Sequence, residues 1–421
     1  MFDQSFCINT LERTIRKKDF DHKLTAALQE IFRQQQITLA LDSANTSFNK
    51  PSNPLGSFPL HGKNIYRFTK LSDDLVARKL CDNLKRYRKK TKPGRSQIVQ
   101  CLNLLLTEGV PFRVYRLDIK SFYESFNANF VDSSIRDLAS LSPHSKSLLI
   151  SLLASYRSMG GTGIPRGLSL SALLSEILMR SFDLSMVHSD NVYYYARYVD
   201  DIIVITSDKE NKKIFLNWTQ AKLPEGLNLN TQKQKVSAVP DKVIVAKGAD
   251  QTERLRFDYL GYSFFVLDPV QIKKLNPNDH HRDVTVDIAA KKIAKIKTRI
   301  IRFLVDHSLQ PDWELLRDRL KFLRQNFSVH NPKIGTKKLA GIYHSYPEIS
   351  PNAVGLLDLD KFLKNAVLSK SGRVFSKSSP HLSPKEKREL LSQSFVRGHQ
   401  EQTFVHFSGK RINQIQRCWL Y

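Results

Sequence analysis

Apolar and polar positions alternate most clearly along residues 193–206, where the sequence reads YYYARYVDDIIVIT. Aromatic and apolar residues lead into a short break with two adjacent acids, and a β-branched run follows the break. This pattern predicts a tight β-hairpin with Val199 and Asp200 at or near its turn. The apolar arms favour burial as strands, which leaves Asp200 and Asp201 at the exposed tip. An ordinary acidic turn would explain the two acids, and so would a site for divalent cations.

Weaker patterns predict the other elements of the chain. A stretch rich in Pro, Ser, Asn and Gly over residues 48–63 is typical of a loop. The apolar-faced helix that we expect over residues 96–109 ends at Gly109. From residue 283 onward the pattern is helical and basic. The remaining expected elements are helices over residues 11–36, 168–182 and 287–304 and strands over 114–120 and 257–266.

A single acid lies late in the strand expected over residues 114–120. Asp118 follows alternating charged and apolar residues, and a carboxylate among apolar neighbours is costly to bury without a partner. A salt bridge to a neighbouring Arg or Lys would remove that cost, and so would a bound cation. Asp118 is therefore the natural third carboxylate for the hairpin that carries Asp200 and Asp201.

Two further features fit a phosphate-bearing ligand. A glycine-rich loop over residues 160–167 precedes a helix, and glycines let a backbone approach a ligand while a helix N-terminus favours negative charge. Lys233 and Lys235 follow the hairpin on a short turn and strand. Each feature is weak alone, but the loop lies between the single acid and the acid pair.

Composition narrows the class of partner. The chain has 421 residues, which suits two or three domains, and its hydrophobic fraction of 41% allows a sizeable core. A formal charge of +26 favours binding to a polyanion, usually nucleic acid. No run reaches the about 18 apolar residues of a spanning helix, and the start lacks a signal-peptide pattern, so we expect a cytoplasmic protein with no membrane partner. The four scattered cysteines fit reduced thiols.

The positive charge is concentrated in two segments. Residues 75–95 are very basic, and the cluster from Lys85 to Arg95 within them has charges of one sign only, so salt bridges inside this cluster cannot balance it. A solvated helix face is the ordinary explanation, and phosphate contact is the alternative that we favour. In the helix expected over 287–304, isoleucines occupy one face and basic residues the other. The candidate nucleic-acid-binding residues are Lys85, Arg86, Arg88, Lys89, Lys291, Lys295, Arg299 and Arg302.

Together these residues fit phosphoryl transfer onto a nucleic acid. Three carboxylates can hold two Mg²⁺ ions, one for the attacking hydroxyl and one for the triphosphate. Magnesium prefers oxygen ligands, so neither His nor Cys is needed. A nuclease would use similar acids, but it has no need for a triphosphate cradle.

Five short motifs resemble, in their order, motifs A to E of reverse transcriptases. They are LDIKSFY around Asp118, GIPRGLS at 163–169, YVDD at 198–201, LNLNTQK at 227–233 and YLGY at 259–262. The resemblance implies an α+β right-hand polymerase with fingers, a palm that carries a ββ catalytic hairpin, and a helical thumb. It implies N-terminal helices and basic fingers over 1–112, a palm over 113–280 with a fingers segment at about 125–160, and a basic α-helical thumb and C-terminal extension over 281–421.

The resemblance also implies roles for single residues. Asp118, Asp200 and Asp201 would be catalytic metal ligands, the Ile119 carbonyl would complete one metal site, and two Mg²⁺ ions (with Mn²⁺ as a candidate substitute) would be the cofactors. Tyr123 resembles a steric gate whose ring clashes with a ribonucleotide 2′-OH, with core packing as the alternative. Lys233 would donate a proton to pyrophosphate, with Lys235 as its alternative. The expected nucleotide-binding residues are Tyr123, Pro165, Arg166, Gly167, Lys92 and Arg95.

The wording of two motifs is most similar to bacterial defence-associated reverse transcriptases. DIKSFYESF and GIPRGLSLSALLSEI carry this similarity. Two residues depart from the usual reverse transcriptase motifs: Arg197 precedes the third motif, and Arg166 stands where retroviral and many retron enzymes have Gln. The resemblance implies anti-phage defence, a noncoding RNA template, an RNA–DNA hybrid and dNTPs. A second reverse transcriptase subunit and a higher-order oligomer are candidate partners. Untemplated or protein-primed DNA synthesis and a catalytically silent nucleic-acid-binding scaffold are the alternatives.

Overall fold

The chain divides into two compact units. The computed structural model describes residues 3–20, 25–48, 53–60, 62–87, 93–272, 275–331, 336–369, 371, 375–378 and 381–420. Unit 1 comprises Met1–Lys92 and Pro111–Val239, and unit 2 comprises Pro93–Val110 and Pro240–Tyr421.

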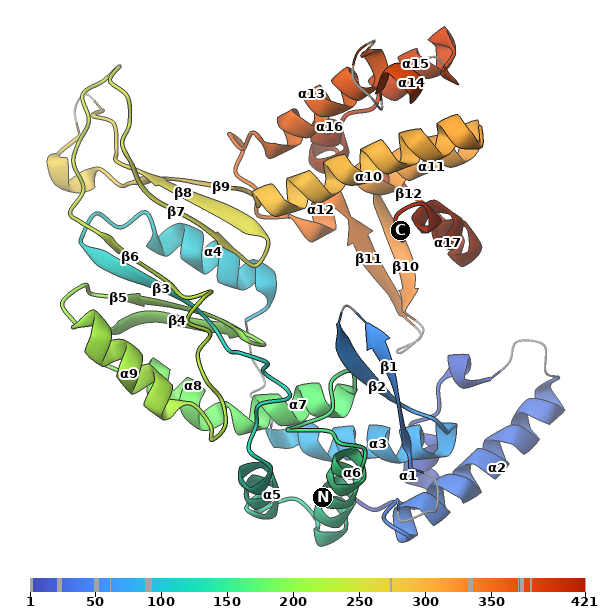
Figure 1. Ribbon diagram of the computed structural model, residues 1–421. Coiled ribbons are helices and arrows are strands. Elements are labelled where there is room, and N and C mark those ends of the chain that lie inside the picture. Colours follow the sequence, from blue (N-terminus) through green and yellow to red (C-terminus); the bar gives the residue numbers. More distant parts are fainter. Residues whose placement is uncertain are drawn as a thin grey trace. The chain divides into compact units, whose positions relative to one another are not determined.

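A four-stranded antiparallel sheet forms the centre of unit 1 (Figure 1). Its strands are β3 (Phe112–Asp118), β4 (Val192–Tyr198), β5 (Asp201–Thr206) and β6 (Lys235–Val239), in the order β4–β5–β3–β6. Helices α8 (Arg180–Val187) and α9 (Lys212–Lys222) lie along one side of it (Figure 1). The sheet contains both the single acid and the acid pair that the sequence analysis identified.

The hairpin predicted over residues 193–206 is confirmed. β4 and β5 pair antiparallel with Tyr198 opposite Asp201, and Val199 adopts a left-handed φ of 62° in the turn. β5 is central, and its residues from Ile202 to Ile205 are all buried, as expected of a continuous β-branched run. β4 lies at the sheet edge, so Tyr193 and Tyr198 stay exposed and only part of that arm is buried.

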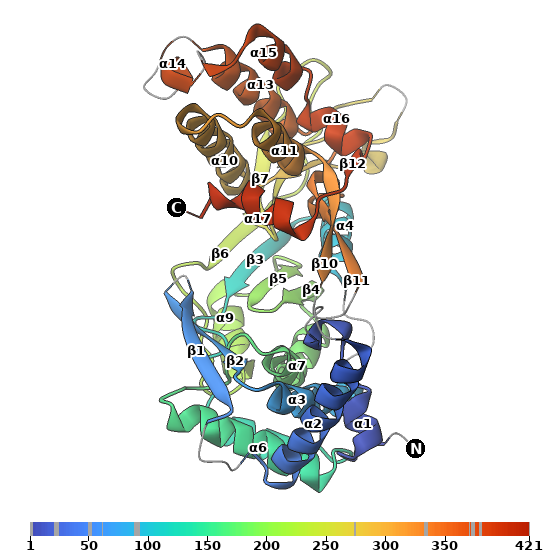
Figure 2. The same ribbon diagram turned by 90° about the vertical axis from the view of Figure 1, so that its right-hand side faces the viewer.

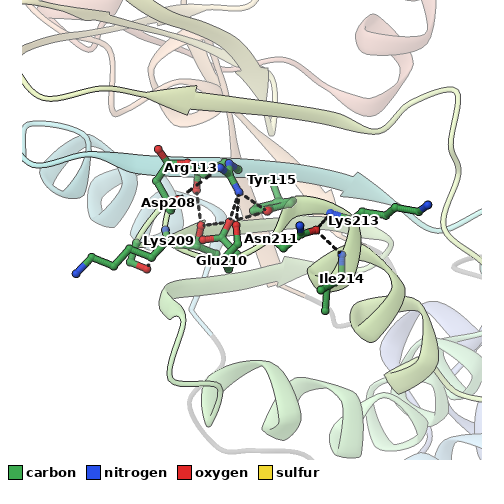
Figure 3. A network of polar contacts seen from close by, with 10 residues as sticks. Arg113, Tyr115, Asp208, Lys209, Glu210, Asn211, Lys213 and Ile214 are labelled. Carbon is green, nitrogen blue, oxygen red and sulfur yellow. Dashed lines mark hydrogen bonds and ion pairs between the residues drawn. The ribbon is translucent and has the colours of Figure 1, made fainter.

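A polar network fixes the register of β3 at the end of the strand away from Asp118 (Figure 3). Glu210 Oε1 accepts hydrogen bonds from Arg113 Nη1 (2.8 Å), from the Tyr115 hydroxyl (2.6 Å) and from Thr206 Oγ1 (2.8 Å). Burial raises the pKa of Tyr115 to about 12, so its hydroxyl stays protonated and donates. Because these contacts tie β3 to the end of β5, they also hold Asp118 opposite Asp201.

Helices and a small hairpin complete unit 1. The helices are α1 (Ile8–Glu12), α2 (Ala26–Asn45), α3 (Leu71–Leu84), α5 (Ala128–Arg136), α6 (Pro143–Ser158) and α7 (Ser169–Leu178). The expected continuous helix over 11–36 is wrong, because α1 ends at Glu12 and the Asp19 carboxylate is held by Arg78 Nη1 (2.6 Å) and Nη2 (2.9 Å). The α7 and α8 helices agree with the helix expected over 168–182.

The loop expected over residues 48–63 is wrong in its second half. Strand β1 (Leu55–Leu60) pairs antiparallel with β2 (Lys63–Phe68), and Figure 2 shows this two-stranded ribbon. Most side chains of β1 are exposed, so no alternation of buried residues marks the strand in the sequence. Gly62 has a φ of +73°, a conformation that glycine adopts without strain and that suits the turn between the strands.

Unit 2 contains sheets as well as helices. β7 (Glu253–Tyr259), β8 (Tyr262–Leu267) and β9 (Asp283–Ile288) form one sheet, and β10 (Asn326–Asn331), β11 (Thr336–Gly341) and β12 (Phe404–Val405) form another. The main helices α10 (Ala290–Leu309), α11 (Trp313–Arg324) and α13 (Gly355–Leu368) pack around one apolar core (Figure 2). The other helices are α4 (Arg95–Leu105), α12 (Ile342–Ser345), α14 (Phe375–Ser378), α15 (Pro384–Leu391), α16 (Phe395–Gln400) and α17 (Gly409–Arg417).

Two expectations for unit 2 are wrong in part. Helix α4 ends at Leu105 rather than at Gly109, because the buried Arg282 guanidinium collects the carbonyls of Glu108, Gly109 and Val110. The segment after residue 281 is not purely helical, because Val284 and Val286 alternate in β9 and β10 to β12 follow. Short strands of this kind are poorly marked by local pattern, since pairing partners distant in the sequence stabilise them. The fold is mixed α/β, and the right-hand arrangement with its three domain boundaries stays a prediction.

Candidate active site

Three carboxylates meet at one end of the unit 1 sheet. Asp118 ends β3 and Asp201 begins β5, and the two are direct Cα partners in the antiparallel pair. Asp200 occupies the turn next to Asp201, and its carbonyl accepts a hydrogen bond from the Ile119 N–H (3.3 Å). The structure therefore brings the predicted metal ligands Asp118, Ile119, Asp200 and Asp201 together.

Both acids of the hairpin, Asp200 and Asp201, have raised pKa values. Burial raises the pKa of Asp200, and the negative charge of Asp118 raises it further. The pKa of Asp201 is raised by burial, and then by the charges of Asp200 and Asp118. Like charges in a partly buried site disfavour the ionised forms, so a bound cation would stabilise this arrangement.

Lys233 and Asn230 hold the Asp118 carboxylate. The Lys233 ammonium lies 3.1 Å from both Asp118 oxygens, and the Asn230 side-chain amide donates to Oδ2 at 3.0 Å. A backbone hydrogen bond joins the same two residues, because the Asn230 N–H donates to the Asp118 carbonyl at 2.7 Å. Lys233 is thus the basic residue that the structure places at the acids. Lys235 begins β6, where it is the Cα partner of Arg116.

A buried arginine, Arg197, is hydrogen-bonded to the turn of the β4–β5 hairpin. The Arg197 guanidinium donates to Asp183 Oδ1 and Oδ2, both at 2.8 Å, and to the Val199 carbonyl at 2.8 Å. Glu176 is a second acidic partner at 3.3 Å, and the Tyr195 hydroxyl donates to Asp183 at 2.6 Å. This residue, which departs from the usual motif, therefore positions the turn that carries Asp200. Its acidic partners Glu176 on α7 and Asp183 on α8 were missed, since no local pattern links them to Arg197.

The glycine loop packs against the segment that follows Asp118. Gly163 has a φ of +67°, and a Cβ there would lie 2.3 Å from the Tyr123 carbonyl oxygen, which accepts a hydrogen bond from the Ile164 N–H (2.8 Å). Gly167 has a φ of +105°, and a Cβ there would lie 2.6 Å from Ile65 of β2. Pro165 between them is buried. Only glycine fits at both positions, so the loop is fixed beside Tyr123.

Tyr123 and Arg166, both expected at the nucleotide, contact each other. The Arg166 guanidinium carbon lies 5.0 Å from the centre of the Tyr123 ring, and Arg166 forms a bidentate salt bridge with Glu124. Burial raises the pKa of Tyr123, and the positive charge of Arg166 acts in the opposite direction. Glu124 was missed by the sequence analysis, although it follows Tyr123 directly.

A cavity of about 350 Å³ adjoins Glu124. It is lined by the β1–β2 hairpin, including Lys63 and Tyr66, by Ser121 and Glu124, and by the end of α6. Lys63 lowers the pKa of Glu124 by its charge, although burial and the Arg166 hydrogen bond have larger effects. Lys63 was missed because the sequence of the hairpin that presents it is typical of a loop.

Other predicted residues belong to other elements or lie outside the described residues. Lys92, Arg88 and Lys89 lie outside the described residues. Lys85 and Arg86 form a short 3₁₀ turn after α3 in unit 1. Arg95 belongs to unit 2, where it donates to the carbonyls of Leu260 (2.7 Å) and Ser345 (2.6 Å) and lies over two tyrosine rings, so its guanidinium is already engaged in packing.

The four predicted residues of α10 differ in exposure. Lys291 and Lys295 are exposed, whereas Arg299 is half-buried and lies 5.0 Å from the Trp419 ring centre. Arg302 donates to the Trp419 carbonyl at 3.1 Å. Burial lowers the pKa of Arg299. Three of the four residues, Lys291, Lys295 and Arg302, are therefore exposed, and Arg299 and Arg302 contact Trp419 near the C-terminus.

Carboxylates are suitable ligands for a hard divalent cation, but the side chains of the described residues are not clustered into a metal site. Within the described ranges, no group of three or more His, Cys, Asp or Glu side chains lies close enough together to hold a metal ion. Carboxylate oxygens without His or Cys are the donor set that Mg²⁺ prefers. The types of residue at this end of the sheet therefore fit the ion.

Comparison with known proteins identifies the domain. Residues 79–264 match the family model described as reverse transcriptase (RNA-dependent DNA polymerase). Over these residues the chain is therefore similar to reverse transcriptases, which are nucleotidyltransferases. No curated protein matches the chain.

The solved structures that match the chain in part include a telomerase. The apo telomerase from Candida Tropicalis, truncated from its C-terminal domain, is 17% identical with a TM-score of 0.30. The match covers 50% of this chain and 52% of the telomerase chain, so this chain spans about half the length of that protein. In the described part of the chain, no helix is both long enough and apolar enough to cross a membrane.

Proposed function

We propose that Asp118, Asp200 and Asp201 form the catalytic centre of a Mg²⁺-dependent RNA-directed DNA polymerase. The observation that carries this proposal is the register that sets Asp118 opposite Asp201, with Asp200 in the adjoining turn. Asp118 and Asp200 would be the main ligands of two ions, with Asp201 and the Ile119 carbonyl completing the sites. The ions would supply an activated 3′ hydroxyl and neutralise the triphosphate.

Basic side chains of unit 1 would hold and release the triphosphate. Lys233 Nζ lies against the Asp118 carboxylate, and the same ammonium is the candidate proton donor to the leaving pyrophosphate. Lys63 lines the cavity beside Glu124 and supplies a second cation on the β1–β2 hairpin. Loss of either charge would weaken transition-state stabilisation.

Tyr123 would select the sugar. Its ring lies against the Arg166 guanidinium, and its carbonyl accepts a hydrogen bond from the Ile164 N–H of the glycine loop. A ring held in this way would clash with a 2′-OH and favour dNTPs, while Pro165, Arg166 and Gly167 would lie beside the incoming nucleotide.

We further propose that the template is a noncoding RNA and that the enzyme acts in anti-phage defence in the cytoplasm. The similarity of DIKSFYESF and GIPRGLSLSALLSEI to defence-associated enzymes supports this role, and the charge of +26 supports binding to an RNA–DNA hybrid. A second reverse transcriptase subunit and a higher-order oligomer belong to the same proposal.

Sequencing of co-purifying nucleic acid tests the template. The wild type and the Asp200→Ala, Asp201→Ala variant are purified in parallel. A discrete RNA in both, with complementary DNA only in the wild type, would support templated synthesis. DNA unrelated to any bound RNA, again only in the wild type, would favour untemplated or protein-primed synthesis, and RNA alone in both would favour the scaffold.

A further inference from the structure

A salt bridge next to the proposed sugar gate has no role in the mechanism above. Arg166 Nε donates to Glu124 Oε1 at 2.7 Å and Nη2 donates to Oε2 at 3.0 Å. This bidentate geometry fixes the plane of a guanidinium, which a lysine could not reproduce. The plane that it fixes lies over the Tyr123 ring, with 5.0 Å between the guanidinium carbon and the ring centre.

The backbone around the ring is fixed independently of this salt bridge. The Ile164 N–H donates to the Tyr123 carbonyl at 2.8 Å, and the Tyr66 N–H donates to the Arg166 carbonyl at 2.8 Å. The glycine loop thus joins the segment after Asp118 to strand β2. The ring itself contacts the Arg166 guanidinium on one face and packs edge-on against the Phe122 ring, with 5.2 Å between the ring centres.

The salt bridge contributes little to the stability of the fold. The side chains of Arg166 and Glu124 are 23% and 30% exposed, and ion pairs open to water typically stabilise by about 0.2–1 kcal/mol. A guanidinium over an aromatic ring restricts that ring through a cation–π contact. The consequence of this pair is therefore local, at the ring of Tyr123.

We propose that Glu124 holds Arg166 across the face of Tyr123, and that this arrangement sets the discrimination between deoxyribo- and ribonucleotides. Glu124 and Arg166 are positioning residues, and the tyrosine ring is the group that meets the sugar. Without the carboxylate, Arg166 loses its fixed plane and the ring gains freedom to turn away from a 2′-OH. This inference rests on the proposed function.

The test compares variants of the pair with a matched control. Three variants remove the salt bridge: Glu124→Gln, Arg166→Gln and the double variant. Arg166→Lys keeps the positive charge but cannot form the bidentate contact. Asp132→Asn is the control, because Arg157 and Asp132 form a similar bidentate pair at 2.8 and 2.9 Å in the same unit. The full chain is given one RNA template and primer, and kcat and KM are measured for dATP and ATP.

We expect Glu124→Gln to keep dATP incorporation while the preference for dATP over ATP falls about tenfold, mainly through a lower KM for ATP. Arg166→Gln, Arg166→Lys and the double variant should show the same loss of preference, since all remove one arrangement. Asp132→Asn should stay within about twofold of wild type. An unchanged preference in Glu124→Gln, or an equal loss in Asp132→Asn, would overturn the proposal.

Equilibrium binding separates this inference from the proposed function. The dissociation constants for dATP and ATP are measured without turnover on the same variants. A wild type that incorporates neither nucleotide refutes the polymerase assignment. The ratio of the dissociation constants for ATP and dATP then tests the positioning role of Glu124. A tenfold loss of the ratio in Glu124→Gln supports the positioning role, and a wild type that binds both nucleotides equally overturns it.

Discussion

At the scale of single residues, the site is defined by three acids that lie close together in the fold. Asp200 and Asp201 are partly buried beside Asp118, and Lys233 forms a salt bridge with Asp118. Asp200 and Asp201 could be predicted because adjacent acids between apolar arms are unusual, and Asp118 and Lys233 because they lie in motifs of the same series. Glu124 and Lys63 could not be predicted, since their roles depend on which segments fold together.

The raised pKa values predict how stability depends on pH. Because folding raises the pKa of Asp200 and Asp201, the metal-free folded chain binds more protons than the unfolded chain. Its free energy of unfolding should therefore fall as the pH rises from the ordinary Asp pKa of about 4 through the raised values. Asp200→Asn, Asp201→Asn should flatten this fall and raise the melting temperature at pH 7.

Thermal melts with and without Mg²⁺ check this prediction. Mg²⁺ should raise the melting temperature of the wild type at pH 7 and leave the double variant unchanged, since only the wild type has charge to neutralise. Equal responses of the two proteins to Mg²⁺ would contradict a metal site at these acids.

At the scale of elements, the catalytic turn depends on a buried ion pair beneath it. The Arg197 side chain is 1% exposed and joins Asp183 of α8 to the Val199 carbonyl in the turn. The hairpin itself could be predicted from alternation and the acid pair. Its support could not, because the partners lie on helices that are brought close only by tertiary packing. The same reason explains why β1 and β9 to β12 escaped prediction.

Substitution of Arg197 should therefore affect stability and activity together. Arg197→Met leaves Asp183 and Glu176 without their buried cation, and breaking such a pair typically costs about 3–5 kcal/mol. Urea unfolding measures this loss, and kcat should fall as the turn loosens. Arg33→Met, which removes an exposed pair with Glu12, is the control and should cost at most about 1 kcal/mol. Equal losses in both variants would contradict the role of Arg197.

At the scale of the whole molecule, the charge of +26 predicts binding led by phosphate contacts. The nucleic-acid class of partner could be inferred from composition alone, whereas the placement of basic residues could not. Arg95 lies in a basic run, yet its guanidinium holds two carbonyls inside unit 2. Lys291 and Lys295 are exposed on α10 and remain available to a duplex.

Salt dependence of binding checks the role of phosphate neutralisation. The affinity for an RNA–DNA hybrid should fall steeply between 50 and 200 mM salt. Lys291→Gln, Lys295→Gln should weaken binding and reduce the slope by about 1 for each phosphate that the variant no longer neutralises. A flat salt dependence in the wild type would contradict phosphate-led binding.

Primer extension on RNA tests the central claim most directly. The full chain is incubated with dNTPs, Mg²⁺ and either its co-purified RNA or a primed RNA, and Asp118→Asn and Asp200→Asn are compared with Asp132→Asn. We predict Mg²⁺-dependent DNA synthesis by the wild type and Asp132→Asn, and a loss of at least about 1,000-fold in the two site variants. Synthesis that survives Asp118→Asn and Asp200→Asn, or no synthesis by the wild type on any RNA, would contradict the account.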